Sequence, residues 1–203
     1  SIVGENGAGK STLMKILNGA LLPDEGEIWI DGEKAHIHVP KDAADYGIAM
    51  IWQELQFVPN LTIQENLVIN EHPVKKGTPF VDWKKVNRDA KETLTKEGIT
   101  HDPKMLLKDI SVSDIQLLEI IKATSKDAQI IIMDEPTSSL TQHESERLFE
   151  KIKKMRDEGR TILYISHKME EVFTLSDDVT IMRDGKWIAT KEAADLTTGE
   201  IIK

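Results

Sequence analysis

The chain has 203 residues, 39% of them hydrophobic, so it can bury one good-sized core, with or without a smaller lobe. Acidic residues outnumber basic ones by 35 to 26, and the formal charge of −9 argues against a general nucleic-acid binder, which needs a basic face. There is no cysteine, which excludes disulfides, zinc-thiolate sites and thiol nucleophiles.

The first predicted elements are a strand, a glycine-rich loop and a helix. Residues 1–3 are typical of the end of a buried strand, and the apolar periodicity predicts a helix from about Lys10 to Asn18. The loop between them, Gly4 to Ser11, matches the Walker A pattern of a glycine, four further residues and Gly-Lys-Ser. The sequence therefore predicts a phosphate-binding loop at the start of a helix.

The residue types of this loop suit the capture of a nucleotide's phosphates. Glycines let successive backbone N–H groups turn toward phosphate oxygens, and the helix N-terminus adds a partial positive charge. Lys10 supplies a full charge for the β- and γ-phosphates, and the Ser11 hydroxyl can ligate Mg²⁺. The residues predicted to bind the nucleotide are Gly4, Glu5, Asn6, Gly7, Ala8, Gly9, Lys10, Ser11 and Thr12.

A hairpin and a buried strand are predicted next. Residues 27–30 form the first strand of the hairpin, Asp31-Gly32 is its turn, and its second strand is expected at 35–39. The apolar run at 48–52 suits a strand inside a sheet. His36 and His38 would share one face of the second strand, but no third metal ligand accompanies them, so we interpret them as surface residues.

The segment from about Leu61 to Lys126 contains no convincing strand. Thr62 and Glu65 form a capping-box pattern, which opens a helix. A charged amphipathic helix is expected from Asp82 to Glu97, where Gly98 stops it. We therefore interpret this segment as a helical insertion that forms a second lobe.

A βαβ unit and a hairpin are predicted in the last third of the chain. Residues 129–133 are almost all branched aliphatic, as in a strand that is buried on both faces of a parallel sheet. A helix at about 142–158 separates it from an apolar strand at 161–165. The closing hairpin is expected at 179–182 and 186–189.

Two acidic residues, Asp134 and Glu135, follow the first strand of this βαβ unit in a Walker B pattern. Ligands of parallel sheets bind at the carboxyl ends of the strands. Asp134 would hold Mg²⁺, directly or through water, and Glu135 would polarise the water that attacks the γ-phosphate. The two motifs together indicate a hydrolase with ATP and Mg²⁺ as cofactors.

The stretch Asp134-Glu135-Pro136-Thr137-Ser138-Ser139-Leu140, followed by Ile165-Ser166-His167, resembles the ABC ATPase family. The resemblance covers nearly the whole chain. It implies an α/β fold, in which a P-loop NTPase core has a mostly parallel sheet flanked by helices. It also implies that 1–203 is a single ATPase domain and that 61–126 is a helical subdomain inserted in it.

The same resemblance implies roles for side chains outside the two Walker motifs. Gln53 would sense Mg²⁺ and the attacking water beside the groove that meets the membrane partner, and His167 would contact the γ-phosphate. Residues 138–141 would cross to a partner subunit, although Thr141 stands where many members carry aspartate. The expected catalytic residues are Glu135, His167, Gln53 and Lys10, and the expected metal ligands are Ser11, Gln53 and Asp134.

The family signature, usually Leu-Ser-Gly-Gly-Gln, corresponds to Ile110 to Asp114 and is altered here. The residues Ser111, Val112, Ser113 and Asp114 are expected to act on the nucleotide of a partner subunit. Ser113 replaces a glycine, so its side chain could crowd the nucleotide or forbid a needed backbone angle. A helix from Asp114 to Ser125 is expected to point its N-terminus at phosphate, whereas the alternative makes Ser113 a plain helix cap.

Within the family, the chain is most similar to the importers of ribose, galactose and xylose, for instance at Val81-Asp82-Trp83 and at 164–168. This similarity implies ATP hydrolysis that powers sugar import at the cytoplasmic face of the bacterial cell membrane. The implied partners are a second ATPase domain, transmembrane permease subunits and, indirectly, a periplasmic sugar-binding protein. Residues 1–4 enter the phosphate-binding motif without an initiator methionine, so the N-terminus is expected to be a truncation. Members of this group are longer and carry a degenerate second ATPase half, so a second truncation is expected at Lys203.

Other functions fit the sequence less well. A non-transport ABC ATPase that acts on chromosomes or ribosomes would be favoured by a basic surface or a long coiled coil, and the sequence offers neither. An ATP-binding regulatory module with weak turnover would follow if Ser113 spoiled the shared site, but Glu135 and His167 argue against it. A GTPase is disfavoured because no Asn-Lys-x-Asp stretch is present, and no nucleic-acid partner is expected.

Overall fold

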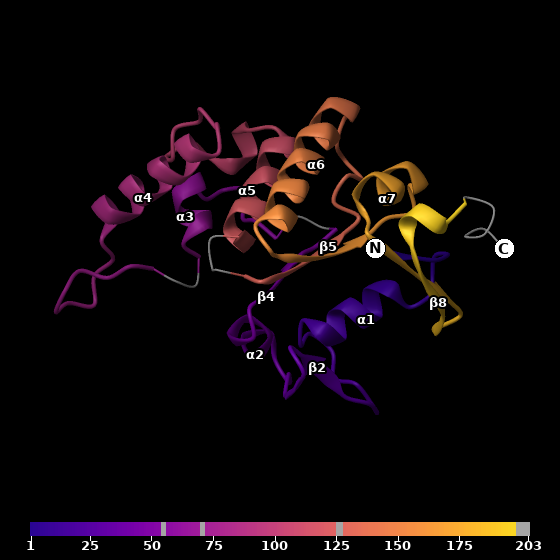
Figure 1. Cartoon of the computed structure of the whole chain (residues 1–203). Helices are drawn as coiled ribbons and strands as arrows, with labels where there is room; N and C mark the ends of the chain where they lie inside the picture. Colours follow the sequence, from indigo (N-terminus) through magenta and orange to yellow (C-terminus); the bar gives the residue numbers. More distant parts are fainter. Residues whose placement is uncertain (54–55, 70–71, 125–127, 198–203) are drawn as a thin grey trace. The chain divides into compact units, whose positions relative to one another are not determined.

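The computed structural model describes residues 1–53, 56–69, 72–124 and 128–197 (Figure 1). The chain divides into two compact units. The first unit comprises Ser1–Gln53 and Ala123–Lys203, and the second comprises Glu54–Lys122.

The first unit is built on a six-stranded sheet with the strand order β4-β5-β6-β1-β7-β8. Neighbouring strands pair in parallel from β4 to β7, and β8 returns antiparallel to β7. The strands are β1 (Ile2–Val3), β4 (Ile48–Ile51), β5 (Ile130–Asp134), β6 (Thr161–Ile165), β7 (Asp178–Arg183) and β8 (Lys186–Glu192). The predicted mostly parallel sheet is therefore confirmed, including the parallel pairing of β5 with β6 across the predicted βαβ unit.

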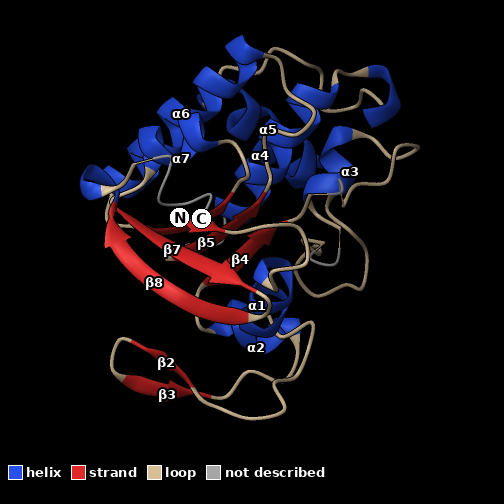
Figure 2. Cartoon of the chain, turned by 90° about the vertical axis from the view of Figure 1, so that its right-hand side faces the viewer, coloured by secondary structure: helices blue, strands red, loops and turns tan. Residues whose placement is uncertain are grey.

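Helices cover both faces of this sheet (Figure 2). The helices α1 and α2 lie on one side of the sheet and α6 and α7 on the other (Figures 1 and 2). Their bounds are α1 (Lys10–Leu17), α2 (Pro40–Asp45), α6 (Gln142–Asp157) and α7 (Met169–Leu175), and a short 3₁₀ turn, η2 (Ala193–Asp195), follows β8. This layered α/β arrangement places the carboxyl ends of the parallel strands at one edge of the sheet.

The two faces of the sheet carry separate hydrophobic clusters, because successive side chains of a strand point to opposite faces. In β1, Ile2 belongs to a cluster with Met14 of α1, whereas Val3 packs with Val172 of α7. Both faces of β1 are thus covered, as expected of a strand inside a parallel sheet.

A separate two-stranded hairpin, β2 (Ile28–Ile30) and β3 (Glu33–Ala35), closes through the predicted turn. Asp31 and Gly32 have positive φ angles of 52° and 81°, which suit a two-residue hairpin turn. The prediction of a strand at 35–39 is wrong, because β3 ends at Ala35.

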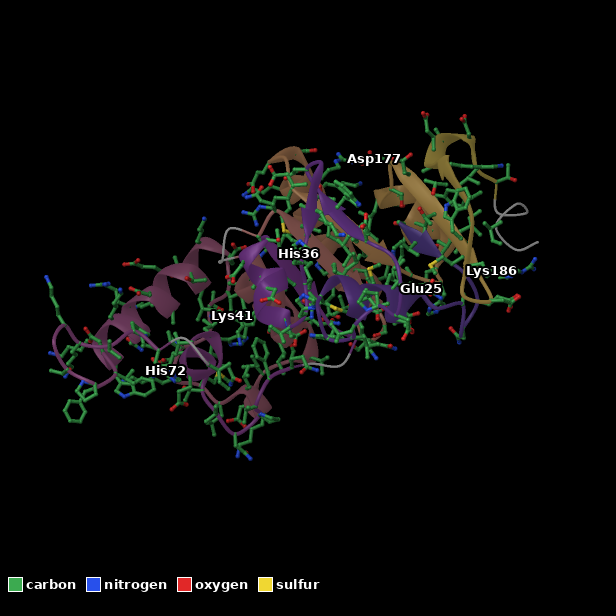
Figure 3. All side chains as sticks on the ribbon, turned by 90° about the horizontal axis from the view of Figure 1, so that it is seen from below. Glu25, His36, Lys41, His72, Asp177 and Lys186 are labelled. Atoms are coloured by element: carbon green, nitrogen blue, oxygen red, sulfur yellow. The ribbon has the colours of Figure 1, made fainter. Side chains whose placement is uncertain are left out.

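The chain leaves the hairpin early because the residues after β3 cap a helix. The Asp42 carboxylate accepts hydrogen bonds from the backbone N–H groups of His38 and Val39, at 2.9 and 3.1 Å. Pro40 starts α2, a helix that the sequence analysis did not predict. Figure 3 labels His36 before this helix and Lys41 within it.

The second unit is helical in its described residues, apart from two isolated β-bridges. Its elements are α3 (Ile63–Leu67), α4 (Trp83–Lys96), the 3₁₀ turn η1 (Leu107–Asp109) and α5 (Val112–Thr124), whose last two residues belong to the first unit. Its core contains Ile63, Leu94 and Leu118.

The helix starts predicted at Thr62 and Asp82 are confirmed. The Thr62 hydroxyl caps α3 by accepting the Glu65 N–H, and the Glu65 carboxylate accepts the Thr62 N–H at 2.8 Å. Asp82 caps α4, which ends before Gly98 as expected. Among the described residues, no helix combines the length and the hydropathy that a membrane span requires.

Candidate functional site

A cavity of about 680 Å³ opens in the first unit around the loop between β1 and α1. Its lining comes from the Walker A loop and from the chain just after β4, β5 and β6. The lining residues are Gly4, Glu5, Asn6, Gly7, Ala8, Gly9, Lys10, Ser11, Thr12, Gln53, Glu135 and His167. Twelve of the residues predicted to act on the nucleotide thus share one cavity.

The loop folds tightly at its first residue, Gly4. A Cβ atom at this position would lie 2.2 Å from the backbone oxygen of Met182, so only glycine fits between the loop and β7. At the other end of the loop, Gly9 precedes α1 without a side-chain cap, and no acidic residue lies in the first turn of α1. The first N–H groups of α1 are therefore left for an anion.

Lys10 is held inside this loop. Its ammonium donates to the backbone oxygens of Gly4 at 2.8 Å and Glu5 at 3.0 Å, and the residue is 6% exposed. These contacts fix the position of a positive charge at the floor of the cavity. A charge held in this way attracts the phosphates of a nucleotide without first having to be ordered.

Two neighbouring acids take different positions at the end of β5. Asp134 is the last residue of the strand, is 6% exposed and does not line the cavity. Glu135 follows with a φ of 48°, an angle that residues other than glycine rarely adopt. Its N–H donates to the Ile165 oxygen at 3.0 Å, which ties this turn to the end of β6. Glu135 lines the cavity, unlike Asp134.

Glu135 and His167 both line the cavity and contact each other. Their Oε1 and Nδ1 atoms are 3.1 Å apart, although the two residues are 32 positions apart in the sequence. The histidine side chain is 61% exposed and the glutamate side chain 18%. The site therefore pairs a sheltered carboxylate with an imidazole that faces the open space.

The predicted magnesium ligands offer only oxygen donors, the kind that Mg²⁺ prefers. Ser11 and Gln53 line the cavity, whereas Asp134 is buried and does not line it. No group of three or more His, Cys, Asp or Glu side chains able to hold a metal ion occurs in the described ranges. His36 and His38 are both exposed, in line with their interpretation as surface residues.

The four signature residues lie in the second unit and are not among the residues that line the cavity. The expected start of the helix at Asp114 is wrong, because α5 begins at Val112. Ser111, rather than Ser113, is the cap: its hydroxyl oxygen accepts the Asp114 N–H at 3.1 Å. Ser113 lies in the first helical turn, and its hydroxyl is 2.8 Å from that of Ser111.

The backbone angle at Ser113 does not require glycine in this structure. In the described part of the chain, the residues other than glycine with positive φ are Asp31, Glu135 and Asp184. Ser113 thus has a backbone angle that any residue adopts. The predicted end of this helix at Ser125 falls outside the described residues.

One buried carboxylate bonded to the neighbours of this site was not predicted from the sequence. Glu171, in the first turn of α7, is 6% exposed and bonds to residues that flank both Glu135 and His167. Its only signal in the sequence is an acid four residues after His167, which is indistinguishable from an exposed helical glutamate.

The chain is similar to proteins of one known family. The family described as "ABC transporter" matches residues 1–138. A galactose/methyl galactoside import ATP-binding protein, MglA of Clostridium tetani, is 50% identical over 204 residues, which cover 100% of this chain and 40% of that protein. A ribose import ATP-binding protein, RbsA of Caldanaerobacter subterraneus, is 43% identical and is covered to 41%. The chain therefore spans less than half the length of these relatives.

Solved structures share the fold. The crystal structure of a nucleotide-free ATP-binding cassette from an ABC transporter has a TM-score of 0.81 at 27% identity, covering 94% of this chain and 79% of that one. An ATP-binding cassette of an ABC transporter in its ADP conformation also has a TM-score of 0.81, at 26% identity, with 99% and 85% of the two chains covered. The predicted P-loop NTPase fold is confirmed.

Proposed function

Because the chain belongs to the ABC transporter family, we propose that it is an ATPase domain that powers the import of a simple sugar. The observation that carries the proposal is the cavity in which the Walker A loop meets Glu135 and His167. The choice of a sugar is supported by relatives of up to 50% identity whose names describe galactose and ribose import.

In this proposal the first step is phosphate binding by the Walker A loop. Residues Gly4 to Thr12 wrap around the phosphates, and the N-terminus of α1 directs its N–H groups at them. Lys10 gives up its bonds to the loop oxygens in favour of the β- and γ-phosphates. The buried ammonium then neutralises charge that builds up during transfer.

Hydrolysis joins the oxygen of a water molecule to the γ-phosphorus and breaks the bond to the β-phosphate oxygen. Glu135 accepts a hydrogen bond from the attacking water and takes its proton. Nδ1 of His167 contacts Glu135, so Nε2 is the ring nitrogen that can face a γ-phosphate oxygen. Nε2 donates to that oxygen when both ring nitrogens carry a proton. Gln53 lines the same cavity and orients the water with its amide.

Ser11, Gln53 and Asp134 are proposed to hold Mg²⁺. Bound beside the phosphates, the ion would neutralise part of their charge. The hydroxyl and amide reach the cavity from two elements, and the carboxylate supports them from the end of β5. This arrangement needs no cluster of acids.

The remaining parts of the proposal concern the complete protein. We propose that residues 1–203 form one ATPase domain, that about 61–126 form its helical subdomain, and that two such domains close head to tail over ATP. Ser111, Val112, Ser113 and Asp114 would then complete the partner's site, where Ser111 keeps a hydroxyl at the start of α5. The ATPase domain would lie at the cytoplasmic face of the membrane. Its other expected partners are transmembrane permease subunits and, indirectly, a periplasmic sugar-binding protein.

The proposal is tested on the complete protein with Lys10→Ala as the control. Binding of Mg-ATP is measured by calorimetry, and phosphate release is measured in the same preparation. We expect Lys10→Ala to abolish both, because it removes the fixed charge of the phosphate site. Equal ATP binding by the two proteins, both folded by circular dichroism, would contradict the assignment of the loop.

A second experiment tests the transported substrate. Uptake of labelled galactose and ribose is compared in cells with and without the gene and in cells that carry the Lys10→Ala variant. Loss of uptake of one sugar in the last two strains supports import. Unchanged uptake of both sugars, in the presence of a working ATPase, argues for a different cargo.

A further inference from the structure

The buried carboxylate of Glu171 bonds to residues next to the candidate site. Glu171 accepts the Tyr164 hydroxyl at 2.7 Å and the Ser166 hydroxyl at 3.0 Å on its Oε2 atom. Its Oε1 atom accepts the Thr137 hydroxyl at 2.7 Å and lies 3.2 Å from the Lys168 ammonium. One side chain thus takes bonds from four others.

These partners satisfy the carboxylate in spite of its burial. Burial acts to raise the pKa of Glu171, but the hydrogen bonds from Thr137, Tyr164, Lys168 and Ser166 outweigh it and leave the pKa below its ordinary value. Glu171 is therefore an anion at neutral pH. A buried anion is tolerated only where several donors face it, so this cluster constrains the positions of all its members.

The partners of Glu171 flank the two residues proposed to act on the water. Thr137 follows Glu135 by two positions, and Ser166 and Lys168 are the immediate neighbours of His167. Lys168 also bonds directly to the Thr137 backbone oxygen at 3.1 Å. Glu171 and Lys168 thus connect the loop after β5 to the loop after β6 through hydrogen bonds.

We propose that Glu171 is a positioning residue for ATP hydrolysis, whose carboxylate holds the two loops so that Glu135 and His167 keep their contact. The inference rests on the proposed ATPase function. Glu171 does not line the cavity and acts through the residues it binds. A misplacement of about 1 Å among reacting groups can reduce a rate by about a hundredfold, so a clamp of this kind matters for turnover.

The test compares Glu171→Gln with Glu170→Gln in the complete protein. Glu171→Gln keeps the shape but removes the negative charge and replaces one of the two acceptor oxygens with a donor. Glu170 is the exposed neighbour on the same helix and serves as the matched control. We expect kcat to fall about ten- to a hundredfold in Glu171→Gln, with the KM for ATP and the calorimetric ATP affinity within about twofold.

A second pair of variants covers the case in which Glu171→Gln fails to fold. Thr137→Val removes the hydroxyl that binds Glu171 but keeps the volume, whereas Thr137→Ser keeps the hydroxyl. We expect Thr137→Val to lower kcat at unchanged ATP affinity and Thr137→Ser to retain most of the activity. This difference separates positioning from a role in folding alone.

Several outcomes would overturn the inference. It fails if Glu171→Gln, when folded, keeps kcat within about twofold of the unsubstituted protein, or if Thr137→Val and Thr137→Ser behave alike. It also fails if activity and ATP affinity fall in parallel. Failure of the underlying function has a different signature, because the unsubstituted protein would then release no phosphate or Lys10→Ala would be as active.

Discussion

At the scale of single residues, Glu135 combines a chemical role with an unfavourable backbone. Its φ of 48° lies in the left-handed region, which costs residues with a Cβ roughly 1–2 kcal/mol. Its N–H bond to Ile165 and its contact with His167 hold it there. Strain of this kind is found where function requires a side chain to point in a set direction.

We predict that the free energy of unfolding of Glu135→Gly is about 1 kcal/mol higher than that of Glu135→Ala. Both variants should lose ATP turnover. Both variants lack the carboxylate, but only glycine adopts a positive φ without cost. The free energies of unfolding are compared by urea titration, and phosphate release is measured alongside. Equal stability of the two variants would show that the backbone angle carries no strain.

At the scale of elements, α5 carries a buried acid, Glu119. Glu119 is 7% exposed, and its Oε1 atom accepts the Gln56 N–H at 2.5 Å. Its Oε2 atom is buried without a hydrogen-bond partner among the described residues. Burial raises the pKa of Glu119 to about 7, although the Gln56 N–H and Lys122 act in the opposite direction.

This shift predicts a pH dependence of stability. A carboxyl group whose pKa is raised on folding stabilises the native state most below its unfolded value, near 4.5, and this contribution is lost as the pH rises through about 7. We compare the free energy of unfolding of Glu119→Gln with that of the unsubstituted protein at two pH values. We expect this difference to favour the variant more at pH 8 than at pH 5. Urea titrations at the two pH values measure the difference, with the exposed Glu170→Gln as control. A constant difference would contradict a raised pKa.

At the scale of the whole molecule, the cavity is lined by residues that follow several strands of the sheet. Its lining follows β1, β4, β5 and β6, which are separated along the chain by helices and by the second unit. A ligand that contacts all four strand ends can bind well only when the sheet of the first unit is formed. Binding and folding of this unit are therefore linked.

We predict that Mg-ATP stabilises the protein by about 2.7 kcal/mol at a concentration one hundred times its Kd. Thermal unfolding of the complete protein with and without Mg-ATP measures this effect. Lys10→Ala should unfold at the same temperature in both conditions. If the unfolding temperature of the unsubstituted protein also stays the same when Mg-ATP is added, the prediction is contradicted, because Mg-ATP then does not bind preferentially to the folded protein.

What the sequence determined by itself were the features built from neighbouring residues. The Walker A loop, the capping box of Thr62 and Glu65, and the hairpin turn at Asp31-Gly32 all depend on contacts within a few positions, so their spacing along the chain is enough to predict them. Sequence spacing did not predict the helix at 40–45. The Val39 N–H bonds to Asp42 at the start of this helix, so Val39 does not continue the strand that was predicted at 35–39.

Only the tertiary structure decided which distant residues meet. The contact between Glu135 and His167 exists because β5 and β6 pair in parallel and in register, so that their ends coincide. The role of Glu171 as the centre of a buried cluster has the same origin, since it requires α7 to pack behind both strand ends. An isolated glutamate in the sequence carries no sign of this, because burial and partners are properties of the folded chain.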